Sequence, residues 1–132
     1  MTNAEKAMEL LKEAKVFYLA TVEADQPRVR PFGAVCVYED HLYIHTGLGK
    51  NVCNQMMENP KVEICAFDKG KTIRITAEAY YDKRTEAQKA MLDANPGLRN
   101  MYAEDDGKNA VFMLKNGTVT AGNPKESETF EL

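Results

Sequence analysis

The spacing of hydrophobic residues changes several times along the chain, and each change marks the boundary of a predicted element. Residues 4–15 carry apolar side chains at helical spacing with charged side chains between them, which predicts an amphipathic helix that Asn3 can cap. The β-branched and aromatic run at residues 16–22 predicts a strand, which ends in a turn at residues 23–27. The chain is therefore expected to begin with one helix and to continue as a sheet.

Short apolar runs alternate with turn residues over the rest of the chain. Further strands are predicted at residues 28–38, 42–46, 62–67, 72–81, 110–114 and 118–121, and further helices at residues 50–59 and 85–93. The dipeptide Asn116-Gly117 predicts a hairpin between the last two strands. Connections this short require antiparallel pairing, because parallel strands need a long crossover. The pattern predicts a mainly β protein with peripheral helices, a small antiparallel barrel in a single domain over residues 1–132.

Composition and charge exclude several classes of function. Of the 132 residues, 44% are hydrophobic and 28% are charged, which is typical of one soluble domain. The 17 Lys and Arg residues are outnumbered by 20 Asp and Glu residues, so no general basic field exists to bind nucleic acid. No apolar run is long enough to span a membrane and no secretory leader is visible, which favours a cytoplasmic protein without membrane contact.

Cysteine and histidine residues are too few and too scattered to predict a metal centre. Cys36, Cys53 and Cys65 are widely spaced and odd in number, which argues against a disulfide framework and against a zinc site. His41 and His45 are the only histidines, and no carboxylates stand at a spacing that would complete a ligand set with them. We therefore expect reduced thiols and no bound metal.

The segment Thr46-Gly-Leu-Gly-Lys-Asn51 carries the clearest candidate chemistry. It leaves a predicted strand and opens a predicted helix, whose first N–H groups are free to face an anion. Its glycines let the backbone approach closely, while Thr46, Lys50 and Asn51 supply a hydroxyl, a charge and an amide. The residues leave two interpretations open: a phosphate-binding turn, or an ordinary strand-to-helix loop with a solvated lysine.

A second candidate is the segment Pro27-Arg-Val-Arg-Pro-Phe-Gly33. Arg28 and Arg30 are two residues apart and share one face of a strand. Pro31 has no N–H to donate to a sheet, which indicates an edge or a bulge. A free edge offers backbone groups to a flat heterocycle, whereas the alternative is a solvated edge strand protected from aggregation by its proline.

An ordered set of short segments runs along almost the whole chain. It comprises Phe17-Tyr-Leu-Ala-Thr-Val22, Pro27-Arg-Val-Arg-Pro-Phe-Gly33, Leu42-Tyr-Ile-His-Thr46, Lys50 with Gln55, Asn59-Pro-Lys-Val62, Ile73-Arg-Ile-Thr-Ala77, Asn95-Pro-Gly-Leu98 and the tail Glu128-Thr-Phe-Glu-Leu132. This set resembles the pyridoxamine 5′-phosphate oxidase-like family, the FMN-binding split barrels. Within that family it is most similar to the short bacterial branch near the 5-nitroimidazole reductases.

The resemblance implies a fold, a cofactor and an assembly. The fold is a six-stranded antiparallel split β-barrel, and two copies form a homodimer with FMN at the subunit interface. The implied cofactor-binding residues are Val29, Arg30, Pro31, Phe32 and Gly33 beside the isoalloxazine ring, His45 and Thr46 beside the ribityl phosphate, and Lys50 and Asn51 at the phosphate. Both faces of residues 32–38 carry apolar side chains, which is more than a one-sided strand requires and independently favours a second copy.

The resemblance also implies an oxidoreductase that reduces a small flat acceptor with electrons from NAD(P)H. Such an enzyme needs no acid–base side chain of its own, because the flavin supplies the chemistry, and none is assigned here. A non-catalytic flavin carrier or sensor, or a split barrel holding haem or a deazaflavin, are the alternatives. Oxidation of pyridoxamine 5′-phosphate itself is not expected, since Asn51 and Val52 replace a basic residue of the true oxidases and Val35 replaces a lysine.

Overall fold

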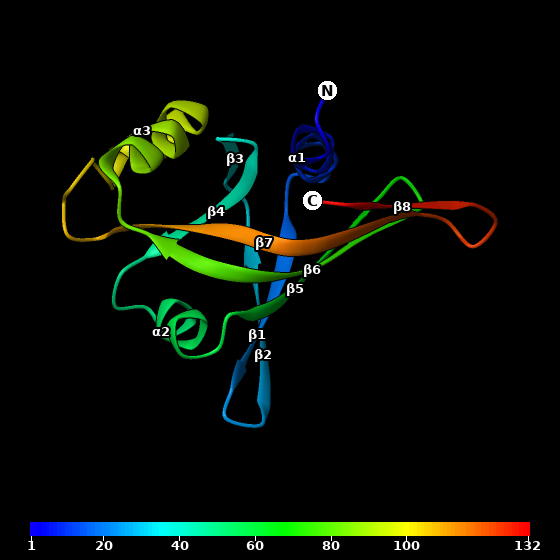
Figure 1. Ribbon diagram of the computed structural model, residues 1–132, viewed down its shortest axis with the longest axis horizontal. Helices are drawn as coiled ribbons and strands as arrows, with labels where there is room; N and C mark the ends of the chain where they lie inside the picture. The colour runs from blue at the N-terminus through cyan, green and yellow to red at the C-terminus, as the bar shows by residue number, and fades with distance from the viewer.

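Eight antiparallel strands form one strongly curved sheet in the computed structural model, which describes residues 1–132 (Figure 1). The strands are β1 (Phe17–Glu23), β2 (Gln26–Phe32), β3 (Val35–Tyr38), β4 (His41–Gly47), β5 (Lys61–Asp68), β6 (Lys71–Asp82), β7 (Asn109–Gly122) and β8 (Ser127–Glu131). The helices are α1 (Asn3–Ala14), α2 (Asn51–Glu58), α3 (Thr85–Ala94) and the 3-10 helix η1 (Pro96–Asn100). The sheet runs in the order β2-β1-β5-β6-β7-β4-β3, and β8 also pairs with β7. The mainly β class and the split-barrel architecture are confirmed.

The number of strands is eight rather than six. The predicted strand at residues 28–38 is in fact two strands, β2 and β3, separated at Gly33 and Ala34, where the chain leaves one sheet edge and joins the other. The tail of the chain adds β8, which pairs with the second half of β7. The apolar pattern did not reveal the break between β2 and β3, because a change of pairing partner leaves the alternation of side chains almost intact. It did not reveal β8 because Phe130 is the only apolar residue of that strand.

The predicted hairpin at Asn116-Gly117 is wrong. Both residues lie inside the single long strand β7, where the pairing with β6 shifts register between Thr76 and Glu78. Asn116 adopts φ 52°, the conformation that also favours this dipeptide in turns. Here it forms a β-bulge, so that β7 bends and its two halves pair with β4 and β8 in turn.

The main core lies between the inner face of the sheet and the helices α1 and α2. On β6, the alternation of Ile73, Ile75 and Ala77 with exposed polar residues places every second side chain in this core. Helix α1 is capped by Thr2 rather than Asn3: Thr2 and Glu5 exchange hydrogen bonds of 3.1 and 2.8 Å in a capping box.

Strand β3 is covered on both faces by helices of the same chain. Val35 belongs to the main core, which α1 also enters, whereas Cys36 belongs to a second cluster with Ala87 and Met91 of α3. The apolar surplus of residues 32–38 is thus satisfied within one chain, and this segment no longer argues for a second copy.

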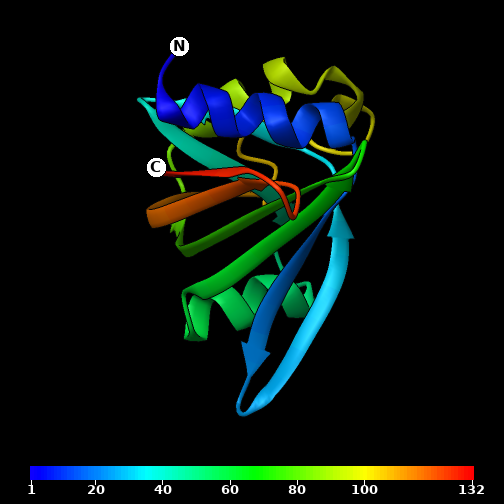
Figure 2. The ribbon, with the colours of Figure 1, turned by 90° about the vertical axis from the view of Figure 1, so that its right-hand side faces the viewer.

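The hairpin of β1 and β2 projects beyond the rest of the sheet (Figure 2), and β2 forms the sheet edge. In this structure no helix combines the length and the apolar character that a membrane crossing requires.

Candidate functional site

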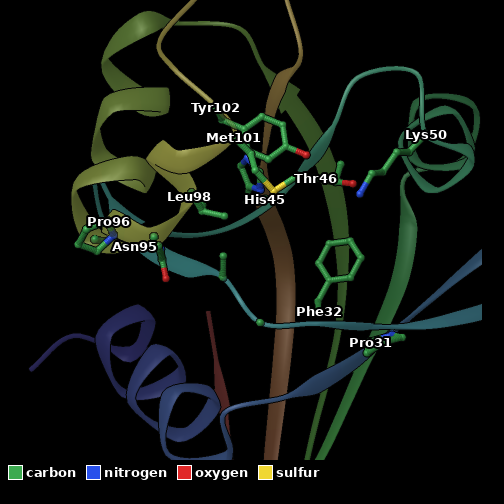
Figure 3. Close-up of a pocket in the computed structure, with 14 residues that line it drawn as sticks. Pro31, Phe32, His45, Thr46, Lys50, Asn95, Pro96, Leu98, Met101 and Tyr102 are labelled. Carbon is green, nitrogen blue, oxygen red and sulfur yellow. The ribbon is translucent and has the colours of Figure 1, made fainter. Parts of the chain in front are cut away.

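A cavity of about 690 Å³, open to solvent, lies between the end of β2, the end of β4 and the segment that follows α3 (Figure 3). It is lined by Pro31, Phe32, Gly33, Ala34, His45, Thr46, Lys50, Ala94, Asn95, Pro96, Gly97, Leu98, Met101 and Tyr102. Six of the nine predicted site residues are therefore brought together here, although they come from segments that are separate in the sequence. We call it the larger cavity.

A second cavity of about 460 Å³ lies between β2 and the start of α2. It is lined by Glu23, Arg28, Val29, Arg30, Lys50, Asn51, Val52 and Gln55. The remaining predicted residues, Val29, Arg30 and Asn51, lie here, and Lys50 is the one residue that lines both cavities. We call this the smaller cavity; unlike the larger one it contains two arginines.

The turn between β4 and α2 places Lys50 at this junction. Gly49 adopts φ 88°, which glycine tolerates without strain, and the Leu48 N–H donates to the Lys108 carbonyl at 2.7 Å. Lys50 is the N-cap of α2, yet its side chain makes no capping hydrogen bond. The first N–H groups of α2 therefore lack a side-chain partner, and the partial positive charge of the helix end adds to that of Lys50.

Arg30 projects from β2 toward α2. Its guanidinium donates to the Thr21 hydroxyl at 2.7 Å, to the Gln55 side-chain oxygen at 2.6 Å and to the Leu19 carbonyl at 3.3 Å. Burial, and to a lesser degree the neighbouring charge of Arg28, lower the pKa of Arg30. Three of its five N–H groups are thus used to join β1, β2 and α2, and the others are available to the smaller cavity.

Arg28 on the same face is already paired. Its guanidinium lies 2.8 Å from the Glu23 carboxylate, and both side chains are about half exposed. Arg30 and Lys50 are therefore the cations of the smaller cavity that have no carboxylate partner.

His45 forms part of the floor of the larger cavity and is only 8% exposed. Its Nε2–H donates to the Asn109 side-chain oxygen at 2.7 Å, and its ring meets the Tyr102 ring edge-on at a centroid distance of 4.7 Å. Burial lowers the pKa of His45, and the nearby charge of Lys50 acts in the same direction. The imidazole is therefore neutral near pH 7 and rigidly held.

Sequence reasoning missed the wall opposite β2. Helix α3 ends at Ala94, and the residues that follow it, Asn95, Pro96 and Gly97, line the larger cavity together with Tyr102. The Asn95 side-chain nitrogen donates to the Val35 carbonyl at 3.0 Å and so fixes this wall against β3. The only signal in the sequence was the segment Asn95-Pro-Gly-Leu98 within the family resemblance.

Comparison with protein families matches this chain with one family over almost its whole length. The model of the family described as pyridoxamine 5′-phosphate oxidase matches residues 4–128. No curated protein gives a match.

Solved structures with the same fold include one that is also similar in sequence. A NimC/NimA family protein from Clostridium acetobutylicum is 49% identical, with a TM-score of 0.95 over 100% of this chain and 95% of that chain. A pyridoxamine 5′-phosphate oxidase-related, FMN binding protein from Nostoc punctiforme is 15% identical, with a TM-score of 0.62 over 98% and 92% of the two chains. A heme binding protein from Mycobacterium smegmatis is 16% identical, with a TM-score of 0.72 over 99% and 58%. The last two likenesses show the fold alone.

Proposed function

The chain belongs to the pyridoxamine 5′-phosphate oxidase family and is similar to a NimC/NimA member of it, and from this premise we propose that it is an FMN-dependent oxidoreductase. It takes electrons from NAD(P)H and passes them to a small flat acceptor. The substrate of the true oxidases is not its substrate, since Val35 and Asn51 differ from the basic residues of those enzymes.

The observation that carries the proposal is the meeting of two unlike cavities at Lys50. FMN has a flat ring system at one end and a doubly charged phosphate at the other. The larger cavity offers the apolar surfaces of Phe32, Leu98 and Met101, which suit a flat ring. Arg30, Lys50 and the start of α2 gather positive charge, which suits the phosphate. The donor set of the chain therefore fits this cofactor.

Every predicted site residue except Val29 has a role in this arrangement. The phosphate lies beside Lys50, with Arg30 and Asn51 on the side of the smaller cavity. Thr46 and His45 line the path from the phosphate to the ring, and Pro31, Phe32 and Gly33 flank the ring itself. Val29 stands next to Arg30 on β2 but turns its side chain, 69% exposed, to the opposite face.

The chain binds and orients the cofactor and the acceptor, and it contributes no acid–base group to the reaction. When bound, the flavin supplies hydride and electron transfer. The wall after α3 contributes Pro96, Leu98 and Met101, against which a flat acceptor packs beside the ring. The neutral His45 is held by Asn109 and adds no charge to this surface.

A homodimer completes the proposal. The outer face of β1, β2 and β5 exposes three large apolar side chains: Tyr18 is 51% exposed, Val29 69% and Phe67 71%. Exposed apolar groups of this size on adjacent strands are typical of a surface covered by a partner. A second copy placed on this outer face lies next to β2, which borders both cavities.

Reconstitution with FMN tests the proposal directly. The purified protein is mixed with FMN, freed of excess cofactor and examined by visible absorbance, after which NADH or NADPH is added without oxygen. We expect a bound flavin spectrum that bleaches and returns when a nitroaromatic or quinone acceptor is added. Bound flavin that does not bleach would favour the carrier or sensor, and a Soret band with haem in place of flavin binding would favour the haem alternative.

A further inference from the structure

Three polar groups without a partner in the protein converge on one part of the larger cavity. The hydroxyls of Thr46 and Tyr102 and the ammonium of Lys50 point toward the same region (Figure 3). Thr46 is only 5% exposed as a residue, so its side chain is held in place, and its hydroxyl makes no hydrogen bond within the chain. Donor groups that converge on a cavity without a partner in the protein are available to a ligand there.

Gly47 makes this convergence possible. A Cβ at this position would lie 3.1 Å from the Tyr102 hydroxyl oxygen and 3.5 Å from the Cε of Lys50. The two side chains therefore approach the same side of Gly47 and occupy the space that a larger residue would fill. Its φ is not positive, so glycine is needed here for room and not for backbone conformation.

The position of Tyr102 is fixed from both directions along the chain. Its backbone N–H donates to the Leu98 carbonyl at 2.8 Å, and its ring packs on the buried His45. The following loop is held by Asp106, whose carboxylate accepts from the N–H groups of Ala103 at 2.9 Å and Asn109 at 2.7 Å. The hydroxyl is thus preorganised, so little conformational entropy is lost when it binds a ligand.

The chemistry of the three donors favours an oxyanion. One cation and two hydroxyls can each donate to a different terminal oxygen of a phosphate. Lys50 is the only cation of the larger cavity, and residues 51 and 52 are Asn and Val, so the start of α2 carries no second basic side chain.

We propose that the Tyr102 hydroxyl donates directly to the phosphate of bound FMN. Together with Thr46 and Lys50, it replaces the second basic side chain that the start of α2 lacks. This inference rests on the proposed function and adds to it a binding residue from the loop after η1. The cofactor site then includes both walls of the larger cavity.

Comparison of FMN with riboflavin, which lacks the phosphate, isolates this contact. Tyr102→Phe keeps the ring on His45 and removes only the hydroxyl. A hydrogen bond to a charged group contributes roughly 1.5–3 kcal/mol, so the FMN dissociation constant should rise about ten- to a hundredfold in a fluorescence titration. The dissociation constant of riboflavin should stay the same. Tyr80→Phe, on an exposed tyrosine outside the cavity, is the matched control and should change neither.

Two results would overturn the inference while leaving the proposed function intact. One is an unchanged FMN constant in Tyr102→Phe, and the other is an equal loss for FMN and riboflavin, which would mean that the hydroxyl touches the ring or the ribityl chain. Gly47→Ala provides a second variant, because its methyl group would displace the hydroxyl and should weaken FMN in the same selective way. A wild-type protein that binds no FMN would overturn the proposed function and this inference together.

Discussion

Lys50 lies where the two cavities meet, and its ammonium makes no hydrogen bond or ion pair within the chain. A cation that is exposed and unpaired contributes little to folding. Its position at the start of α2 instead adds a full charge to the partial charge of the helix end. We therefore expect Lys50 to contribute to ligand binding rather than to folding stability.

Lys50→Ala should weaken FMN binding without unfolding the protein. Loss of one charge-assisted contact corresponds to roughly 1.5–3 kcal/mol, or about ten- to a hundredfold in affinity. Fluorescence titration measures the affinity, and urea unfolding measures the stability. Lys12→Ala, on the exposed face of α1, is the charge-matched control. An unchanged FMN affinity would place the phosphate elsewhere.

His45 makes stability depend on pH. Its pKa is lowered in the folded protein by burial, whereas the unfolded chain has the ordinary value near 6.5, so the unfolded state binds more protons below that pH. The stabilising contribution of neutral His45 is thus fully present above about pH 6.5 and is lost as the pH falls through the lowered pKa of the folded state.

The expected result is a fall in the free energy of unfolding between pH 7.5 and pH 5, each pKa unit of difference being worth about 1.4 kcal/mol. His45→Gln should flatten this dependence, because glutamine has no titrating group. Urea unfolding at several pH values is the measurement, and an equally steep curve in His45→Gln would contradict the prediction.

At the scale of elements, β7 decides how the sheet closes. Its first half pairs with β4 and its second half with β8, while β6 pairs along its whole length. The bulge at Asn116 and Gly117 lets one strand serve both halves, since a bulge bends the strand and increases its twist. Phe130 and Leu132, at the end of the chain, pack against the main core.

Gly122→Ala should loosen the junction of β7 and β8. A Cβ there would overlap the backbone of Glu126 and Ser127, and backbone atoms cannot move aside as a flexible side chain can. We expect a loss of roughly 1–3 kcal/mol in the free energy of unfolding, which is typical of overpacking. Gly97→Ala is the control, because nothing lies within 4 Å of its added Cβ. Equal stability of the two variants would show that β8 accommodates the added methyl group without loss of stability.

At the scale of the whole molecule, the two cavities are bordered by an edge strand. β2 has no further strand beside it, and the outer face that it shares with β1 and β5 exposes apolar side chains. An uncovered edge next to an apolar surface is a liability in a monomer, and a partner chain removes it.

A homodimer is therefore the expected state at micromolar concentration, as measured by light scattering after size-exclusion chromatography. Phe67→Lys should shift it toward monomer and, because the proposed cofactor site borders the proposed interface, should also weaken FMN binding. Met57→Lys introduces the same charge at an exposed apolar position of α2 and serves as the control. A wild-type protein that remains a stable monomer would remove the shared-site proposal.

Much of this molecule was predictable from local patterns. The alternation along β6 and the helical spacing of α1 follow from the period of each element, and a period is visible in any short window. The turn from Thr46 to Asn51 was identifiable because two glycines and a lysine between a strand and a helix are the local requirements of an anion site. Pro31 was likewise recognisable as a residue of an edge strand, because it has no N–H to donate to a sheet.

Other features were decided only by tertiary structure. Asn116-Gly117 meets the requirements of a hairpin, but pairing with β6 on one side and with β4 and β8 on the other stabilises a bulge instead. Strands β4 and β7 pair so that Gly47 lies opposite Asn109, and this pairing brings the loop after η1 over the start of α2. Tyr102, on that loop, therefore reaches Gly47. The sequence by itself determined the helices, most of the strands and the position of the glycine-rich turn between a strand and a helix, because these depend on neighbouring residues. The second wall of the cavity depends on strand register between distant segments, a long-range contact that no local pattern records.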